Sequence, residues 1–284
     1  MKRLFNILTM VVLFVGCTPD FDPQTDSDQR NATFRFDTEH LFDDVLSQYV
    51  DHAALGDATI SDTQRIRIAV FCYDAGGVLL NKAILFANHG ETLSVTFRHL
   101  MKDTPYHFIF LGDVVEYENE TDYVERWFHL NYQQLDQFYT VFIYKSWSGA
   151  KDVLWHCDTT LFVENKTYDI PLNQQTYNGY IFFINNAGVE ELSISCEYHT
   201  SLYLSPLSGR EKKFFSNSTT APITEYGGWG YTIPKIDSTI NFEITLKESN
   251  GTHVVNKSVV NLSCRPFQIY FNCATKEIEQ VNFY

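Results

Sequence analysis

Residues 65–78 read Arg-Ile-Arg-Ile-Ala-Val-Phe-Cys-Tyr-Asp-Ala-Gly-Gly-Val, and this segment shows the fold most clearly. Its first part alternates with a period of two, which places alternate side chains on opposite faces of a β-strand. One face carries Ile66, Ile68, Val70 and Cys72, and the other carries Arg65 and Arg67. Asp74 to Gly77 has the composition of a turn, and a second strand restarts at Val78. The segment therefore predicts a β-hairpin with one apolar face.

A second hairpin is predicted near the end of the sequence. Phe242, Ile244 and Leu246 alternate on one strand, Asn250-Gly251 favours a tight turn, and residues 253–262 return. Further strands are expected at residues 34–36, 83–87, 92–97, 106–111, 141–144, 154–157, 160–163, 167–172, 179–184, 192–197, 201–204, 267–272 and 277–283. Helical spacing predicts one short helix at 41–50 and a helical turn near 130–138. Residues 205–220 are polar and contain Pro206 and Gly209, so a long loop is expected there.

Many short strands separated by turn residues predict an all-β fold built from β-sandwiches. The length suggests two tandem domains, which we place at residues 34–158 and 159–284. Residues 17–33 contain Asp20, Asp22, Asp26 and Asp28 with two prolines and no apolar period, so they are interpreted as a flexible tether. Residues 1–16 are interpreted as a signal peptide.

The signal peptide follows from the first residues. Lys2 and Arg3 precede an apolar run from residue 4 to residue 16, which is shorter than the roughly 20 residues of a membrane-spanning helix. Phe14-Val15-Gly16-Cys17 resembles the lipobox of bacterial lipoproteins, although leucine is usual where Phe14 stands. The resemblance implies cleavage before Cys17, lipid attachment to its thiol and a place at the cell outer membrane. An ordinary secretory signal is the alternative.

The acidic composition excludes one class of partner. The whole chain has a formal net charge of −14. Removing residues 1–16 leaves 19 basic and 35 acidic residues, a net charge of −16. Such a surface repels phosphates, so nucleic acid is not expected as a partner. The 23 Phe and 17 Tyr residues favour strands.

Five cysteines remain after Cys17. None forms a Cys-x-x-Cys pair, so no zinc site is expected. Cys72, Cys196 and Cys273 lie in strand patterns and are interpreted as core residues. A disulfide between Cys264 and Cys273 stays open as an alternative.

The order of these segments resembles the fimbrial anchor and accessory lipoproteins of Bacteroidales. Residues 65–78 resemble their opening strand and its aromatic-Asp-x-x-Gly turn, and residues 104–110 (Thr-Pro-Tyr-His-Phe-Ile-Phe) resemble a later strand. Asp169-Ile170-Pro171-Leu172 stands where their second domain begins, and residues 241–262 resemble its late hairpin. Asn173 follows Leu172, whereas those proteins often carry an arginine soon after this leucine. The resemblance implies two transthyretin-like domains and a place at the base or along the shaft of a pilus.

Catalysis is not expected. Gly-x-Ser-x-Gly, His-Glu-x-x-His and phosphate-binding glycine loops are absent from the sequence. His156 precedes Cys157, but neighbours on a strand point to opposite faces and cannot act as base and nucleophile. The chain is therefore interpreted as a non-enzyme without cofactor or metal.

Two features could bind partners. The cluster Tyr226-Gly227-Gly228-Trp229-Gly230-Tyr231 could stack on a sugar through Tyr226, Trp229 and Tyr231, or it could be a bend whose Trp229 plugs the domain edge. Open strand edges could receive a strand from a fimbrial subunit. The sequence favours a lipid-anchored anchor or accessory subunit of a pilus-like polymer; a surface glycan-binding lipoprotein is the alternative.

Overall fold

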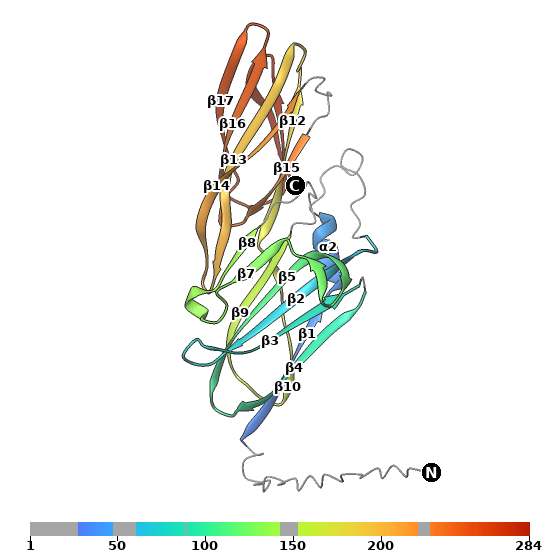
Figure 1. Ribbon diagram of the computed structural model, residues 1–284, viewed down its shortest axis with the longest axis vertical. Helices are drawn as coiled ribbons and strands as arrows, with labels where there is room; N and C mark the ends of the chain where they lie inside the picture. The colour runs from blue at the N-terminus through green and yellow to red at the C-terminus, as the bar shows by residue number, and fades with distance from the viewer. Residues whose placement is uncertain (1–27, 48–60, 89, 143–152, 221–227) are drawn as a thin grey trace, which may run out of the picture.

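The computed structural model describes residues 28–47, 61–88, 90–142, 153–220 and 228–284 (Figure 1). The predicted signal peptide, Cys17 and almost all of the tether lie outside these residues. The molecule is elongated, and two groups of strands follow one another along its long axis. Among the described residues, no helix is long and apolar enough to cross a bilayer.

The first unit consists of two sheets and one helix. The smaller sheet has the order β10-β1-β4, with bounds β1 (Gln29–Asp37), β4 (Thr92–Met101) and β10 (Lys166–Asp169). The larger sheet has the order β11-β9-β5-β2-β3, and β6 pairs with β5. Its bounds are β2 (Gln64–Tyr73), β3 (Leu79–Ala87), β5 (Pro105–Asn119), β6 (Asp122–Val124), β9 (Leu154–Phe162) and β11 (Asn173–Gln174). The helix is α2 (Glu39–Ser47).

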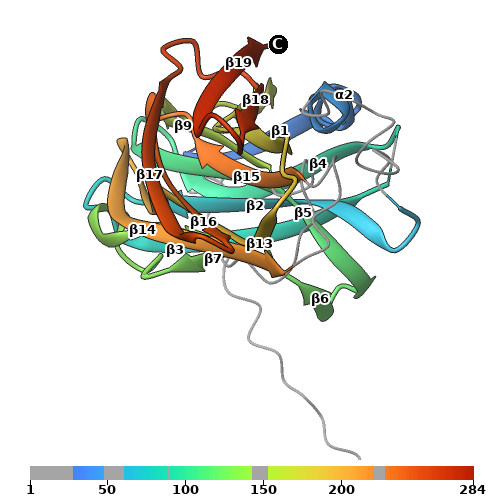
Figure 2. The same ribbon diagram turned by 90° about the horizontal axis from the view of Figure 1, so that it is seen from above.

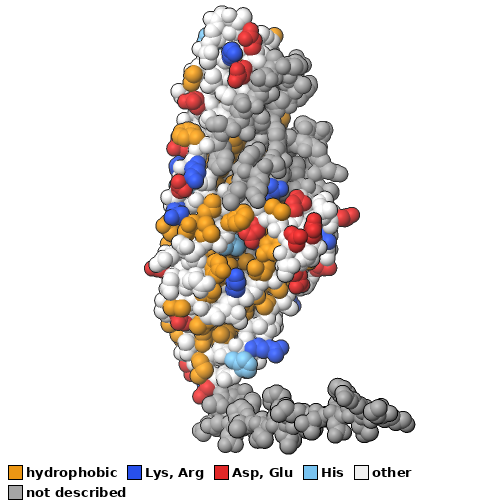
Figure 3. All heavy atoms as spheres, in the orientation of Figure 1, with side chains coloured by type: hydrophobic (Ala, Val, Ile, Leu, Met, Phe, Trp, Pro, Cys, Tyr) orange, Lys and Arg blue, Asp and Glu red, His pale blue; other side chains and the backbone are white. Residues whose placement is uncertain are grey.

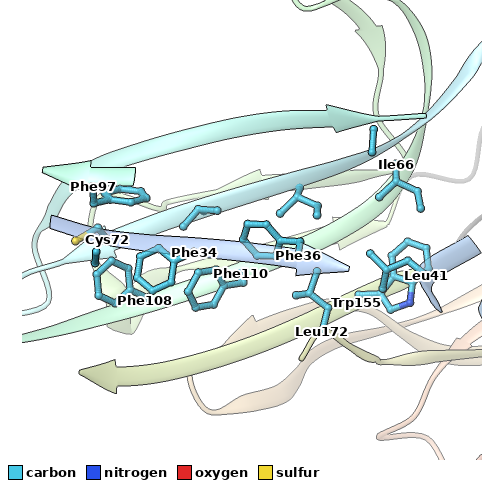
Figure 4. Packing of buried hydrophobic residues seen from close by; sticks show 14 of the residues in the cluster. Phe34, Phe36, Leu41, Ile66, Cys72, Phe97, Phe108, Phe110, Trp155 and Leu172 are labelled. Carbon is cyan, nitrogen blue, oxygen red and sulfur yellow. The ribbon is translucent and has the colours of Figure 1, made fainter. Parts of the chain in front are cut away.

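Aromatic rings fill the space between these two sheets. Phe34 on β1 is fully buried, and its ring centroid lies 4.6 Å from that of Phe108 and 5.0 Å from that of Phe110, both on β5. Figure 4 shows these rings between the sheets, with Trp155 and Leu41 of α2 at one end of the row. The indole N–H of Trp155 donates to Asp44 on the same helix at 2.8 Å. The predicted apolar alternation therefore builds a continuous core.

The second unit is a sandwich of two sheets. One has the order β15-β12-β18-β19 and the other the order β17-β16-β13-β8-β7, with β14 also paired to β13. The bounds are β7 (Trp127–Leu130), β8 (Tyr139–Phe142), β12 (Thr176–Ile184), β13 (Val189–Leu204), β14 (Leu207–Thr220), β15 (Gly228–Pro234), β16 (Thr239–Glu248), β17 (Gly251–Val260), β18 (Phe267–Asn272) and β19 (Glu277–Phe283). A 3-10 helix covers Leu135–Gln137. Viewed along the long axis, the two sheets face each other (Figure 2).

A third apolar cluster joins the two units, and we call it the seam. Phe71 of β2 and Leu111 of β5 contribute from the outer face of the larger sheet of the first unit. Phe138, next to β8, packs on Phe71 at 4.7 Å between ring centroids. Leu202 and Leu204 of β13 complete the cluster and are fully buried. The strands β7 and β8 come from the first half of the sequence but pair in the sheet of β13, so the chain passes between the units more than once.

The main structural predictions are confirmed. Across the described ranges, the chain is all-β apart from α2 and the 3-10 helix. Both predicted hairpins are present: β2 pairs with β3, and β16 pairs with β17 through Glu248 and Gly251. Gly77 has φ +77° in the first turn, a conformation that glycine adopts at little cost. The Asp74 carboxylate accepts the backbone N–H groups of Gly76 and Val78 at 2.9 Å, which fixes this turn.

Three predictions need correction. Residues 205–220 are not a long loop, because β14 occupies most of them and pairs with β13 along its length. The boundary placed after residue 158 falls inside β9, and the following short strands pair with the first unit: β10 with β1 and β11 with β9. The sheet pairing therefore places the last change from the first to the second unit near residue 175, after the earlier entry of β7 and β8 into the sheet of β13. The predicted helix at 41–50 begins earlier, at Glu39, and its last three residues lie outside the described part.

Candidate functional site

The candidate site for a partner strand is an open sheet edge, where backbone N–H and C=O groups lack a neighbouring strand. In the second unit, the strands with a described neighbour on one side only are β7, β14, β15, β17 and β19. In the first unit, they include β3, β4 and β10. These edges differ in length, charge and regularity, and the differences decide which of them can accept a strand.

The edge strand β19 ends the described chain and closes the second sandwich. Opposite β18, Tyr270 pairs with Gln280 and Phe271 with Ile278, so Glu279 is an additional residue. This is a β-bulge, and it accounts for the uneven spacing of Ile278 and Val281. Both of those side chains pack against the core of the second unit. The strand therefore has a structural role, and its bulge and glutamates make it a poor edge for pairing.

The edge strand β14 is longer and carries the exposed side chains of one border of the second unit. Phe214 is 62% exposed. The Arg210 guanidinium lies over the ring of Tyr139 on β8, 3.8 Å from its centroid, and its Nε donates to the hydroxyl of Tyr203 on β13 at 3.3 Å. Hydrogen bonding to Tyr203 raises the pKa of Arg210 further above its already high value, so this group is always a cation. This group was not predicted from the sequence, because residues 205–220 were expected to form a loop.

The three residues of the predicted sugar platform lie in different environments. Tyr226 is outside the described residues. Trp229 lies on β15, where its backbone pairs with Ile181 of β12. Tyr231, on the same strand, is only 4% exposed and packs in the core, with its ring 6.4 Å from those of Tyr198 and Phe242. The structure thus places Tyr231 where a sugar would not reach it.

A serine, a histidine and an aspartate meet at the seam, but not as a catalytic triad. The Ser205 hydroxyl donates to Asp158 Oδ2 at 2.9 Å and lies 3.2 Å from His107 Nε2. The same Nε2 is 3.8 Å from Asp158, and Nδ1 is bonded to Thr160 at 2.9 Å. Activation of a serine requires the carboxylate on the opposite ring nitrogen. The cluster is therefore a polar contact between β5, β9 and the end of β13.

None of the five described cysteines is in a disulfide. Cys72, Cys196 and Cys273 are fully buried, as predicted, and burial raises the pKa of the Cys72 thiol to about 12 and that of Cys273 to about 11. Cys264 and Cys273 are not bonded to each other, and the Cys264 thiol lies 3.0 Å from the carbonyl oxygen of Lys235. The thiols are therefore poor nucleophiles and serve packing.

Small-molecule and metal sites have little support in the described part of the chain. A surface hollow of about 720 Å³ lies beside β1 and is lined by Arg35, Asp37, His40, Thr92, Asp169, Ile170 and Pro171. Its two central charges satisfy each other, because Arg35 donates to Asp169 at 2.6 and 3.0 Å. This hydrogen bonding lowers the pKa of the Asp169 carboxyl. No group of three or more His, Cys, Asp or Glu residues in the described part could hold a metal ion.

No family model and no curated protein matches the chain. Among solved structures, the fimbrial anchor protein Mfa2 from Porphyromonas gingivalis has a TM-score of 0.55 at 12% identity, over 90% of this chain and 98% of Mfa2. The chain has the fold of a fimbrial anchor protein. A candidate polysaccharide-binding protein from Bacteroides thetaiotaomicron gives 0.53 at 11% identity, over 90% of this chain and 95% of its own. A candidate adhesin from the same species gives 0.50 at 10%, over 90% and 96%.

These similarities cover both units, so the shared feature is the whole two-unit body and not one common sandwich. The resemblance predicted from the order of the sequence segments is therefore confirmed at the level of the fold. The three neighbours carry fimbrial, adhesin or polysaccharide-binding names, and none of them is named as an enzyme.

Proposed function

We propose that the chain is a lipid-anchored cell-surface protein that acts as an anchor or accessory subunit of a fimbria-like polymer and binds partner subunits by strand-edge pairing. The observation that carries the proposal is the fold similarity to Mfa2, which extends over 98% of that fimbrial anchor protein. The lipobox-like Phe14-Val15-Gly16-Cys17 supports lipid attachment at Cys17 and a place at the outer membrane. A single acyl chain binds a membrane only marginally, and a bacterial lipid anchor supplies several acyl chains.

The arrangement of the two units suits a protein that carries load between a membrane and a polymer. The first described strand, β1, begins at one end of the elongated molecule, and the hairpin of β16 and β17 lies at the other end (Figure 1). Between them, Phe71, Phe138 and Leu202 bury apolar side chains in the seam. A continuous apolar seam resists separation of the units, because pulling them apart would expose this surface to water. A lipid at the β1 end would leave the second unit available to a partner.

A glycan-binding surface lipoprotein is the second candidate. The Bacteroides thetaiotaomicron neighbour with a TM-score of 0.53 is named as a candidate polysaccharide-binding protein, which favours it. The buried position of Tyr231 weighs against a sugar platform made of Tyr226, Trp229 and Tyr231, since stacking on a sugar needs an exposed ring. Retention of soluble capsular polysaccharide by the purified protein would favour this candidate over the fimbrial one.

The fimbrial proposal is tested at Cys17. In cells that assemble the polymer, Cys17→Ser should abolish incorporation of radiolabelled palmitate and release the protein, with its attached polymer, into the medium. Cys264→Ser is the matched control, because it removes a partly exposed thiol that makes no disulfide. Fatty-acid labelling of the Cys17→Ser protein would show that the anchor lies elsewhere. Normal labelling of the wild type, with no polymer co-purifying, would instead overturn the fimbrial role and leave the anchor intact.

A further inference from the structure

The edge of β14 offers a long backbone surface. This strand has 14 residues and pairs with β13 from Leu207 opposite Leu204 to Thr220 opposite Glu191. On its other side it has no neighbour among the described strands. The register shifts on both sides of Ser201, so the pairing is irregular around Arg210 and regular from Lys212 opposite His199 to Thr220 opposite Glu191. At about 3.3 Å a residue, the regularly paired residues 212–220 extend for roughly 30 Å. This regular part of the edge is a template for another strand unless side chains prevent pairing.

Three of the other edges carry features that discourage pairing. The strand β19 has its bulge and two glutamates, Glu277 and Glu279. The strand β10 has only four residues. On β17, Lys257 forms an ion pair with Glu277, which ties that border to the facing sheet. Bulges, shortness and charged side chains are the usual means by which proteins protect an edge.

The second half of β14 lacks such protection in its sequence. Residues 214–220 read Phe-Phe-Ser-Asn-Ser-Thr-Thr, with no charge, proline or glycine. This composition favours pairing with another strand. All the charges of β14 lie in its first half, at Arg210, Glu211, Lys212 and Lys213. The strand therefore combines a charged recognition segment with an uncharged pairing segment.

The charged half contains one cation that remains available. Lys212 lies 3.3 Å from Asp237 and Lys213 lies 3.4 Å from Glu211, so both have carboxylate partners. Arg210 has no carboxylate partner among the described residues; it contacts Tyr139 and Tyr203 instead. These two tyrosines hold the guanidinium in place, which reduces the entropy lost when it binds a carboxylate. Figure 3 shows charged and hydrophobic side chains together along the border where β14 runs.

We infer that the β14 edge is the acceptor for an extended segment of a partner subunit, and that this segment carries an acidic side chain for Arg210. The inference rests on the proposed fimbrial function and names the surface that it uses. Main-chain hydrogen bonds along residues 214–220 provide affinity, and the carboxylate–guanidinium contact sets the register. Charge complementarity selects an acidic occupant, because the Arg210 guanidinium has no carboxylate partner among the described residues.

Photo-crosslinking on cells that assemble the polymer tests the inference. A photoreactive phenylalanine analogue replaces Phe214 in the full-length lipoprotein, and the matched control carries it at Val254 of β17, the opposite edge of the same sheet. The two side chains are similarly exposed, at 62% and 57%. We expect a crosslink to a fimbrial subunit from position 214 and not from 254. A crosslink from 254 alone, or from neither position while the polymer stays attached, would overturn the inference but leave the fimbrial function standing.

A second variant tests the acidic occupant. Arg210→Met should reduce the polymer retained on cells by on the order of tenfold, because a charge-assisted hydrogen bond is lost. Lys213→Met is the control, since Lys213 is also exposed but already paired with Glu211. Equal polymer retention in wild type and Arg210→Met would show that Arg210 does not bind an acidic side chain of the partner. If no subunit co-purifies even with the wild type, the fimbrial function itself fails and the acceptor edge fails with it.

Discussion

The strands β2 and β16 have the same sequence pattern but different surroundings. Both alternate apolar and polar side chains with a period of two. On β16 the alternation matches burial, with Phe242 and Ile244 inside and Glu243 exposed. On β2 nearly every residue is buried, and this includes Arg67, which is fully inaccessible. Alternation therefore identifies the two faces of a strand, but it does not show whether the second face meets water.

The outer face of β2 is covered because the chain returns over it. Ala69 and Phe71 of that face pack in the seam, against Trp127 of β7 and Phe138. The outer face of β16 has no such cover from the described residues, and its Glu243 pairs across the sheet with Ser195 and Asn256. The first unit thus uses its second face to hold the second unit, whereas the second unit keeps an outer face accessible to partners.

A buried ion cluster lies under this cover. Arg67 donates to both carboxylate oxygens of Asp113 at 2.8 Å, to Glu125, and to the carbonyl oxygen of Trp127 at 2.9 Å. Burial raises the pKa of the Asp113 carboxyl, and the guanidinium opposes this rise. The cluster ties β2 and β5 to the segment between β6 and β7. Its charges are compensated only as long as every partner is present.

Loss of Arg67 should give the largest effect. Arg67→Met leaves the carboxylates of Asp113 and Glu125 without their buried cation, and removal of one partner of a buried pair costs about 3–5 kcal/mol. Urea unfolding of residues 28–284 should show this loss as a lower midpoint.

Arg65→Met is the control on the same face of β2. Arg65 is only partly buried and donates to backbone carbonyls, so its loss should cost less than about 1 kcal/mol. Equal costs for the two variants would show that the cover over Arg67 is open in solution, and the contrast between β2 and β16 would then disappear.

Sequence reasoning found the faces of the strands but not the order of the sheets. Ile66, Ile68, Val70 and Cys72 do form one buried face, as predicted. Burial of Arg67 could not be predicted, because its cover comes from residues about 60 positions later and depends on long-range packing. The strand β14 was missed for a related reason: its pattern is polar and lacks alternation, and only pairing with the long strand β13 makes it extended. The acceptor edge that we propose was therefore not visible in the sequence.

Acid should weaken the seam by an intermediate amount. His156 on β9 is 6% exposed, and burial lowers its pKa below the ordinary value of 6.5. The unfolded chain therefore binds a proton that the folded chain does not, and stability falls as the pH drops below 6.5. Between pH 7.5 and 5.5 this histidine contributes a loss of at most about 1.4 kcal/mol.

The comparison of wild type with His156→Gln isolates this contribution, because glutamine is polar but does not titrate. Burial lowers the pKa of His107 and His129 as well, so the wild type should lose more stability in total. The variant should show a smaller difference between its urea midpoints at the two pH values. Identical pH dependence in both proteins would mean that His156 is protonated in the folded state.

The smallest effect is expected on the outer face of β16. Glu243→Lys changes an exposed side chain whose cross-strand neighbours, Ser195 and Asn256, are uncharged, so stability should change by no more than about 0.5 kcal/mol. Ile244→Ala, one residue further and only 2% exposed, should cost about 2–5 kcal/mol through the cavity that it leaves. Urea midpoints of both variants measure the difference between the two faces of one strand. A cost above about 2 kcal/mol for Glu243→Lys would mean that this face is covered in solution, and the second unit would then resemble the first.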